Sequence, residues 1–434
     1  MLTYSEALEF IHGMTKYGIR LGLDKIEKLL DLLGNPQEGI RVVHVAGTNG
    51  KGSTCAMIDS MLRAAGYRVG LYTSPYLEVF NERIRVDGKN IPDEDVARLT
   101  EMVKNAVEEM ERKGWGQPTE FEVVTALGFL YFKEQKVDYL VLEVGMGGRY
   151  DATNVITPLV SVITPISYDH QQYLGDTLAE IAGEKCGIIK PGRVTVTAPQ
   201  SEEAMKVIEK TCRELKSPLV KVEDEVSYRL ISWGVEGQTF ELKTSKRDYQ
   251  AVRIKLLGDH QLDNAATAVA AVEALQHYGI EIPMDAVKKG LEEARWPGRL
   301  EIMRENPCVL LDGAHNIAGI QVLKGALSKY FPGKRIILLI GILGDKDYMD
   351  MLSEIIPLAD SVVATRPDSP RALSAAELGE SIKKVAKREN LKVFEIDDIE
   401  TAVNAALDMA SPQDLVVCAG SLYLIGKVRS ILRK

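Results

Sequence analysis

The sequence predicts an α/β protein of two domains, because strand-like and helix-like segments alternate along nearly all of its 434 residues. Short β-branched runs between helical stretches favour a mostly parallel, doubly wound sheet. An alternating stretch around 223–255, with a Gly-containing turn, predicts a small antiparallel appendage to that sheet. After the segment ARWPGR at 294–299 the alternation begins again and predicts a smaller, Rossmann-like α/β domain. We therefore expect an N-terminal domain over 1–296 and a C-terminal domain over 297–434.

The individual elements follow in order along the chain. In the first domain Ile40–Ala46 predicts a strand, and Ser53–Ala65 predicts a helix that places Met57, Ile58, Met61 and Leu62 on one face. Further strands of that domain are expected at Arg68–Tyr72, Val137–Val144, Leu159–Ile163 and Arg193–Thr197. Strands of the second domain are expected at Cys308–Leu311, Arg335–Ile340, Ser361–Ala364, Lys392–Phe394 and Leu415–Cys418.

The composition narrows the class of protein. With 45% hydrophobic and 26% charged residues the chain has an ordinary globular balance, and its net charge of -9 argues against a broad nucleic-acid-binding face. No apolar run reaches the roughly 18 residues of a membrane helix, and MLTYSEALEF shows no signal-peptide pattern. The five cysteines form no CxxC pair, so zinc and disulfides are not expected. We expect a cytoplasmic monomer without nucleic-acid or membrane partners.

The sharpest motif is VAGTNGKGS, Val45–Ser53, between a predicted strand and a predicted helix. Glycines let backbone N–H groups turn toward phosphate oxygens, the helix N-terminus adds its dipole, and Lys51 can reach the outer phosphates. The motif therefore predicts a P-loop ATPase domain. Gly52 stands where such loops usually place a hydroxyl, and Ser53 comes one residue late. We therefore look elsewhere for the residue that binds the metal ion.

The sequence GTNGKGS resembles that of the folylpolyglutamate synthases and bifunctional dihydrofolate synthases of the Mur ligase superfamily. Peptidoglycan-building Mur ligases usually place Thr directly after the Lys, so Gly52-Ser53 favours the folate branch. Further blocks that are similar to the family, in family order, are Arg20–Gln37, Thr73–Gly88, Glu143–Asn154, Asp169–Gly192, Gly258–Ala268, Trp296–Glu301 and Leu311–Asn316.

The resemblance implies a set of nucleotide-binding and catalytic residues. It implies ATP binding by Asn49, Gly50, Lys51, Gly52, Ser53, Asn264, Arg299 and Asp312. Asn264 is also an unusual polar residue on an apolar helix and needs a partner. We expect catalytic roles for Lys51, Lys185 and His315. His315 and Asn316 are expected near the incoming glutamate or the transferred phosphoryl group, although Asn316 equally suits a helix cap.

ATP chemistry needs Mg²⁺, held by carboxylates and water, to offset the phosphate charge, and the resemblance implies two such Mg²⁺ ions. Glu143 ends the apolar run VDYLVLEVG, so it faces the edge of the sheet where ligands bind. The resemblance implies that Glu143, Ser74 and His170 bind magnesium and that Lys185 is carbamylated by CO₂ to supply oxygen ligands. The alternatives are an arginine-paired carboxylate, a turn-forming serine, an ordinary histidine and a solvated helix charge, respectively.

The resemblance also implies two stretches that bind the pterin. They comprise Thr119, Glu120, Phe121 and Glu122, and Tyr150, Asp151 and Ala152. Phe121 could stack on a pterin ring or simply pack in the core. Tyr76 stands where the family often has His, so no contact is assigned to it.

The predicted reaction is an ATP-dependent ligation. A folate carboxylate attacks the γ-phosphate, and L-glutamate then attacks the acyl-phosphate with release of phosphate. Dihydropteroate is a second expected substrate, which would give dihydrofolate. The main alternative is a Mur-type amino-acid ligase that acts on a peptidoglycan precursor. A P-loop regulator without ligase activity leaves Arg299 and Asp312 unexplained, and a plain scaffold leaves Lys51, Glu143 and His170 unexplained.

Overall fold

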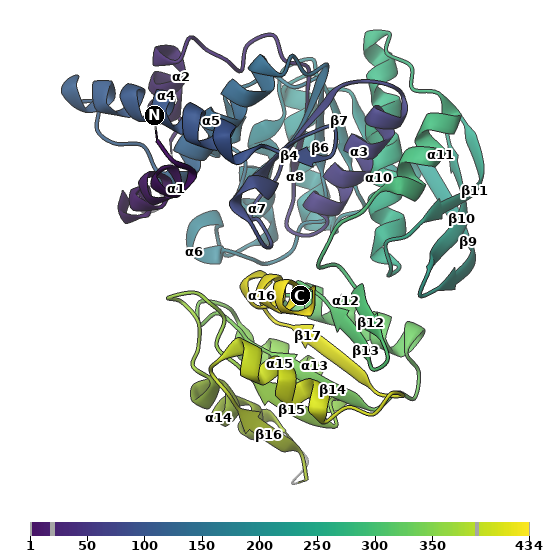
Figure 1. Ribbon diagram of the computed structural model, residues 1–434. Helices are drawn as coiled ribbons and strands as arrows, with labels where there is room; N and C mark the ends of the chain where they lie inside the picture. Colours follow the sequence, from purple (N-terminus) through teal and green to yellow (C-terminus); the bar gives the residue numbers. More distant parts are fainter. Residues whose placement is uncertain (1, 18–21, 387–389, 434) are drawn as a thin grey trace. The chain divides into compact units, whose positions relative to one another are not determined.

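The computed structural model describes residues 2–17, 22–386 and 390–433 (Figure 1). The first two residues of the block Arg20–Gln37 lie outside these ranges. The chain divides into two compact units, which are described separately. The first comprises the chain up to Ser232 with Thr239–Ile254 and Leu262–Arg295, and the second comprises Trp233–Gln238, Lys255–Gln261 and the chain from Trp296 onward.

The first unit is built on an eight-stranded sheet. Six neighbouring strands are parallel, and two strands at one edge are antiparallel. In spatial order the strands are β4 (Lys89–Asn90), β3 (Ile84–Val86), β2 (Val69–Tyr72), β5 (Tyr139–Glu143), β1 (Val42–Ala46), β6 (Val160–Ile163), β7 (Val194–Thr197) and β8 (Leu219–Lys221). Every residue of β1, β2, β5 and β6 is buried, which explains their continuous apolar runs.

Helices cover both faces of this sheet. Val42, Tyr72 and Leu140 face a core formed with α1 (Tyr4–Gly13), α2 (Asp24–Leu32), α4 (Asp93–Arg112) and α5 (Glu120–Glu134). The opposite face is covered by α3 (Lys51–Ala64), which packs on β1, β2 and β5 and against α11 (Met284–Glu293). Figure 1 shows these two groups of helices on opposite sides of the unit. The remaining helices are η1 (Met14–Tyr17), η2 (Phe80–Arg83), η3 (Ala152–Asn154), α6 (Gln171–Leu174), α7 (Leu178–Lys185), η4 (Cys186–Ile188), α8 (Glu202–Glu214), α9 (Val222–Glu225), α10 (His260–Ala274) and η5 (Leu275–Tyr278).

The helix after the phosphate loop is more deeply buried than its pattern predicted. All of Ser53–Leu62 is buried, because α3 lies between the sheet and α11. A Cβ at Gly290 of α11 would overlap the backbone of Met61, so only glycine permits this close packing. The buried surface therefore extends beyond the predicted face of Met57, Ile58, Met61 and Leu62.

A separate three-stranded sheet forms the predicted appendage. Its neighbouring strands are β9 (Val226–Gly234), β10 (Gly237–Thr244) and β11 (Asp248–Ile254). Connections this short between hydrogen-bonded neighbours require antiparallel pairing, so the predicted antiparallel appendage is confirmed with one additional strand.

The second unit is a Rossmann-like α/β layer, as predicted. Its strands in spatial order are β12 (Glu301–Glu305), β13 (Cys308–Leu311), β17 (Leu415–Ala419), β14 (Ile336–Ile340), β15 (Ser361–Ala364) and β16 (Lys392–Glu395). Only β12 is antiparallel to its neighbour. One face packs on α12 (Ile317–Tyr330), α13 (Tyr348–Ile355) with η6 (Ile356–Leu358), and α14 (Ala375–Val385). The strands β14 and β17 also contact α15 (Ile399–Asp408) and α16 (Leu422–Leu432), respectively.

Two further observations concern the chain as a whole. All five cysteines are free thiols, and four of them are buried as small core residues. Within the described ranges, every helix is either too short or too polar to cross a membrane.

Candidate active site

The predicted ATP and metal residues of the first unit gather at one edge of its sheet. The strands β2, β5, β1 and β6 are neighbours and run parallel, so their carboxyl ends lie side by side. Ser74 follows β2, Glu143 ends β5, the phosphate loop follows β1 and His170 follows β6. Ligands of open α/β sheets bind at such carboxyl ends, so four separate chain segments converge where chemistry is expected.

The phosphate loop is fixed by the segment that follows β6. The backbone N–H groups of Thr48 and Asn49 donate to the Pro165 carbonyl at 3.0 and 3.2 Å. Asn49 Nδ2 donates to Ser167 Oγ at 3.1 Å. Gly50 has φ +82° and precedes α3, which begins at Lys51, two residues earlier than predicted. A left-handed residue at this point suits glycine, and the first N–H groups of the helix that follows can bind an anion.

Two lysines approach the same point of the phosphate loop. Lys51 Nζ donates to the carbonyl oxygens of Gly47 and Thr48, each at 3.3 Å. Lys185 Nζ donates to the Gly47 carbonyl at 2.8 Å. Its side chain is buried, and no carboxylate of the described residues lies within ion-pair distance of it. Burial, and then the charge of Lys51, lower the pKa of Lys185 to about 7. The interpretation of Lys185 as a solvated helix charge is therefore wrong.

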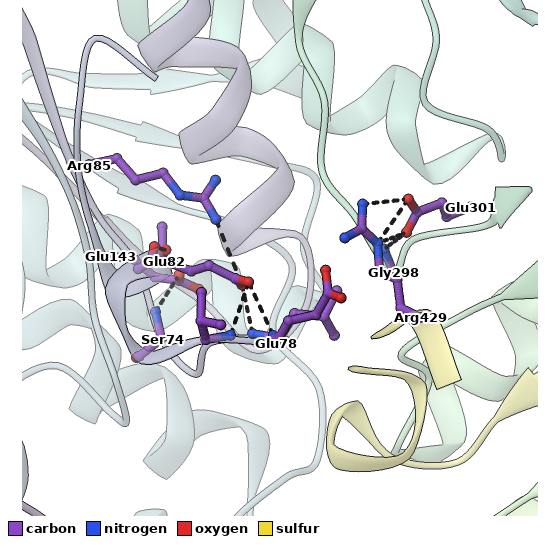
Figure 2. Close-up of polar contacts among 11 residues, drawn as sticks. Ser74, Glu78, Glu82, Arg85, Glu143, Gly298, Glu301 and Arg429 are labelled. Atoms are coloured by element: carbon purple, nitrogen blue, oxygen red, sulfur yellow. Dashed lines mark hydrogen bonds and ion pairs between the residues drawn. The ribbon is translucent and has the colours of Figure 1, made fainter. Parts of the chain in front are cut away.

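Glu143 and Ser74 contact one another across the edge of the sheet. The Ser74 N–H donates to Glu143 Oε2 at 3.2 Å, and Glu143 is buried (Figure 2). The sequence alone did not identify the residue that shapes the Ser74 loop, which is Glu82. Its carboxylate accepts the N–H groups of Leu77, Glu78 and Val79 at 2.9, 3.1 and 3.2 Å.

His170 lies on the loop that leads into α6. It has a left-handed backbone (φ +53°), and its N–H donates to Asp169 Oδ1 at 2.9 Å. Burial and Lys51 lower the pKa of Lys185, and the charge of Asp169 partly opposes that lowering. Asp169 therefore lies on the same side of the sheet edge as Lys185. Among the described residues, no three His, Cys, Asp or Glu side chains are arranged to hold a metal. The predicted set contains only two of these types, so its remaining donors must be a hydroxyl, a modified lysine, phosphate oxygens and water.

The donor types of this edge nevertheless suit magnesium. Mg²⁺ prefers one or two carboxylates, with water and phosphate oxygens completing its shell. Glu143 is a buried carboxylate beside the Ser74 loop and close to the phosphate loop across β1. The residues present therefore fit a magnesium ion bound together with a phosphorylated ligand.

Asn264 is brought to the phosphate loop from α10. It is buried, and a Cβ at Gly50 would overlap its Oδ1 atom. Asn264 therefore lies directly against the left-handed residue before α3. The structure brings together two predicted nucleotide residues that are more than 200 positions apart in the sequence.

The stretch Thr119–Glu122 divides into residues with different roles. Thr119 and Glu122 form the capping box of α5: Glu122 N–H donates to Thr119 Oγ1 at 3.3 Å, and Thr119 N–H donates to Glu122 Oε2 at 2.7 Å. Phe121 lies against the backbone of Gly145, where a Cβ would overlap its ring. Glu120 accepts hydrogen bonds from Thr15 Oγ1 at 2.9 Å and contacts His12 Nδ1 at 3.1 Å. Burial raises the pKa of Glu120, but these two contacts outweigh it and lower the pKa overall.

The stretch Tyr150–Ala152 is held by Asp151. Its carboxylate accepts the N–H groups of Met146 at 2.9 Å and Thr153 at 3.0 Å, and the Thr153 hydroxyl at 2.5 Å. Burial raises the pKa of Asp151, and these hydrogen bonds oppose that rise. Ala152 is buried, whereas Tyr150 is exposed. Asp151 therefore shapes the loop, and Tyr150 presents the accessible ring.

The second unit brings its own predicted residues together. Asp312 follows β13 and accepts the N–H groups of Leu300 and Ala314, each at 2.9 Å. Burial raises the pKa of Asp312, and Arg299 opposes that rise. His315 Nδ1 donates to the Gly313 carbonyl at 2.7 Å. Asn316 caps α12, since its Oδ1 accepts the Gly319 N–H at 2.8 Å, which confirms the helix-cap interpretation.

Comparison with known proteins identifies the family. Residues 45–272 match the Mur ligase middle domain, and residues 298–422 match the Mur ligase, glutamate ligase domain. The chain is 40% identical over 432 residues to the dihydrofolate synthase/folylpolyglutamate synthase of Bacillus subtilis, which covers 99% of both chains.

Two solved structures are similar over nearly the whole chain. The folylpolyglutamate synthase of Mycobacterium tuberculosis, complexed with ADP, superposes with a TM-score of 0.91 at 34% identity and covers 99% of both chains. Escherichia coli FolC, in complex with DHPP and ADP, superposes with a TM-score of 0.88 at 30% identity and covers 99% of this chain and 98% of that one. The resemblance seen in the motifs is therefore confirmed over its full length, and the chain belongs to the folylpolyglutamate synthase and dihydrofolate synthase family of Mur ligases.

Proposed function

We propose that this protein joins L-glutamate to the carboxylate of a folate, in an ATP-dependent reaction through an acyl-phosphate, and that it also converts dihydropteroate to dihydrofolate. The observation that carries the proposal is the convergence at the carboxyl ends of β2, β5, β1 and β6. A phosphate loop, a buried carboxylate beside a hydroxyl, and two lysines are the groups that phosphoryl transfer to a carboxylate requires. The peptidoglycan alternative is less well supported, because the full-length relatives act on folates by name.

The residues proposed to bind ATP are those that the family resemblance implies. In the first unit, Asn49, Gly50, Lys51, Gly52 and Ser53 surround the helix N-terminus where phosphates bind, and Asn264 lies against Gly50. In the second unit, Arg299 and Asp312 are proposed to contact the nucleotide. The ADP complexes of two similar structures support this use of the fold.

Magnesium is proposed to bind at Ser74 and Glu143, with a second ion at His170 and a carbamylated Lys185. Bound magnesium would offset the negative charge of the phosphate oxygens. The Lys185 amine is buried and has a carbonyl rather than a carboxylate as its contact, a setting in which neutral amine can react with CO₂. Carbamylation replaces a buried cation by an anion, which suits the neighbouring Lys51.

The pterin is proposed to lie between the stretches Thr119–Glu122 and Tyr150–Ala152. Phe121 and Tyr150 offer aromatic rings for stacking, and Glu120 offers a carboxylate to the polar edge of the pterin. Thr119, Glu122 and Asp151 contribute mainly by fixing the backbone, as their hydrogen bonds indicate. The complex of Escherichia coli FolC with DHPP supports a pterin site in this fold.

The proposed steps use the protein's own residues as follows. Lys51 and Arg299 stabilise the negative charge that develops on the transferred phosphoryl group. His315 donates from Nδ1, so its neutral imidazole carries the lone pair on Nε2, which can accept a proton from the glutamate amine. No covalent enzyme intermediate is needed.

We further propose domains at 1–296 and 297–434, a monomeric state and a cytoplasmic location.

A substrate panel tests the proposal. The purified protein would be given ATP, Mg²⁺ and L-glutamate with dihydropteroate, with a reduced monoglutamyl folate, or with a nucleotide-linked peptidoglycan precursor. We expect ADP and a product heavier by one glutamyl residue with either pterin, and neither in Lys51→Met. Product formation with the peptidoglycan precursor alone would contradict the folate proposal and support a Mur-type ligase that acts on a peptidoglycan precursor. Product from only one pterin would limit the proposal to that reaction.

A further inference from the structure

We propose that the ion pair between the buried Arg429 and the partly buried Glu301 positions Arg299, so that Arg429 is a positioning residue for the reaction although it lies 130 positions from Arg299 in the sequence. The inference rests on the proposed role of Arg299 in contacting ATP. It concerns only residues of the second unit, from 296 onward, and nothing in the sequence motifs indicated Arg429.

The ion pair has the geometry of a strong, directed interaction. Arg429 Nε lies 3.0 Å from Oε1 and 2.9 Å from Oε2 of Glu301, and Arg429 Nη2 lies 2.9 Å from Oε1 (Figure 2). The arginine side chain is 7% exposed and the glutamate side chain 21% exposed. Desolvating the arginine offsets much of the attraction in such a pair, and replacing a buried ion pair by apolar residues often leaves a fold equally stable. The ion pair is therefore expected to add little stability, so attachment of α16 to β12 does not by itself explain it.

The same carboxylate also fixes the turn that carries Arg299. Glu301 Oε2 accepts the N–H of Gly298 at 2.8 Å, which closes the turn from 298 to 301 (Figure 2). The Gly298 carbonyl accepts the N–H of Gly313 at 2.8 Å. Arg429 thus holds a carboxylate that in turn holds the backbone on the N-terminal side of Arg299.

The backbone of this turn is strained and needs such contacts. Leu300 has φ +45°, a left-handed conformation that is unfavourable for a residue with a side chain. Its N–H donates to Asp312 Oδ2 at 2.9 Å. Arg299 therefore lies between a residue held by Glu301 and a residue held by Asp312, and loss of either contact allows the turn to relax.

The side chain of Arg299 has a narrow place to lie. A Cβ on Gly313 would overlap Arg299 Nη1, so the guanidinium runs along the bare backbone of Gly313 beside Asp312. A small rotation of the turn would move the Arg299 guanidinium away from the Gly313 backbone. Misplacing a charged group by about 1 Å can cost on the order of 100-fold in rate, so the turn is a point where a remote residue can control catalysis.

A double-mutant cycle tests whether Arg429 acts through Arg299. Arg429→Met, Arg299→Ala and the double variant would be compared by kcat and by KM for ATP, with folate and glutamate saturating. We expect Arg429→Met to lower kcat/KM for ATP about 10-fold or more in the native background and to have almost no effect in the Arg299→Ala background. Arg429→Lys should recover little, because an ammonium does not reproduce the two-point contact.

Controls separate positioning from a general effect on folding. Arg335→Met removes the ion pair with Asp414 at 2.9 Å, which lies at the amino ends of β14 and β17, and should leave kcat/KM unchanged. If Arg429→Met folds poorly, Glu301→Gln/Arg429→Met leaves no charge without a partner and replaces it in the cycle.

The possible outcomes are distinct. An equal loss from Arg429→Met in both backgrounds, or no loss in the native one, overturns the positioning role while the ATP role of Arg299 stands. Full kcat/KM in Arg299→Ala instead removes the proposed ATP role of Arg299 and the inference with it.

Discussion

Lys51 and Lys185 donate to one shared acceptor, the carbonyl oxygen of Gly47, at 3.3 and 2.8 Å. Two ammonium groups at one carbonyl repel each other, and only Lys185 is buried. The amine best suited to lose its proton is therefore Lys185, whose pKa is lowered to about 7 by burial and by Lys51.

Loss of the Lys185 amine should remove activity. Lys185→Ala and Lys185→Arg are each expected to lower kcat about 100-fold, or ~2.7 kcal/mol of transition-state stabilisation, because neither side chain can be carbamylated. Native mass spectrometry in bicarbonate buffer should show one CO₂ adduct in the unsubstituted protein and none in the variants. Absence of the adduct together with full activity of Lys185→Ala would contradict the carbamate.

Glu82 should control the loop that carries Ser74. Glu82→Ala leaves the N–H groups of Leu77, Glu78 and Val79 without their acceptor, so we expect a loss of ~1–3 kcal/mol in unfolding free energy. The half-saturating Mg²⁺ concentration should rise several-fold, since Ser74 is no longer held. Glu82→Gln retains one carbonyl acceptor, so its stability and its Mg²⁺ dependence should lie between those of the unsubstituted protein and Glu82→Ala. Unchanged Mg²⁺ dependence in Glu82→Ala would show that Ser74 is positioned by other contacts.

The sequence was sufficient for the phosphate loop but not for the contacts that complete the site. The loop could be predicted because nine consecutive residues, Val45–Ser53, carry its signal. The long strands were predictable to within one or two residues at most ends, because burial on both faces leaves continuous apolar runs.

Contacts between residues that are far apart in the sequence could not be predicted, because they produce no local sequence pattern. Glu301 and Arg429 are 128 residues apart, and the ring of Phe121 meets Gly145 from another element. Thr119 and Glu122 have the spacing of a capping box, which the structure shows, while the family resemblance implies substrate binding by the same residues. The phosphate-loop motif, the strand that ends at Glu143 and the family resemblance therefore predicted which residues reach the edge of the sheet, and only the structure showed which residues hold them there.

Gly313 should be intolerant of even a methyl group. Gly313→Ala places a Cβ against both the Arg299 guanidinium and the Leu422 side chain, so we expect kcat/KM for ATP to fall ~10–100-fold, or about 1.4–2.7 kcal/mol. Gly325→Ala is the matched control, because Gly325 lies in α12 and a Cβ there meets nothing within 4 Å. That control should be neutral or slightly stabilising, since alanine favours helix more than glycine does. Equal kinetics for both variants would contradict the placement of Arg299.

Stability in mild acid should depend on His44, which is buried in β1 two residues before Ala46. The Thr153 hydroxyl donates to Asp151, so its oxygen accepts from His44 Nε2 at 2.8 Å. His44 Nδ1 is buried and has no hydrogen-bond partner among the described residues. A proton added at Nδ1 would therefore create a buried charge without an acceptor, and burial, followed by the charge of Lys190, lowers the pKa of His44 to about 3.

The direction of the pH effect follows from this shift. The pKa of the folded form lies below the ordinary value of 6.5, so the unfolded chain binds the proton first as the pH falls. The contribution of neutral His44 is complete above pH ~6.5 and declines toward pH ~3, by at most about 1.4 kcal/mol per pH unit. We expect urea unfolding between pH 7 and pH 4.5 to show a shallower loss of stability in His44→Gln than in the unsubstituted protein. His277→Gln, at an exposed histidine, should follow the unsubstituted protein, and an identical slope in all three would show that His44 does not carry this acid sensitivity.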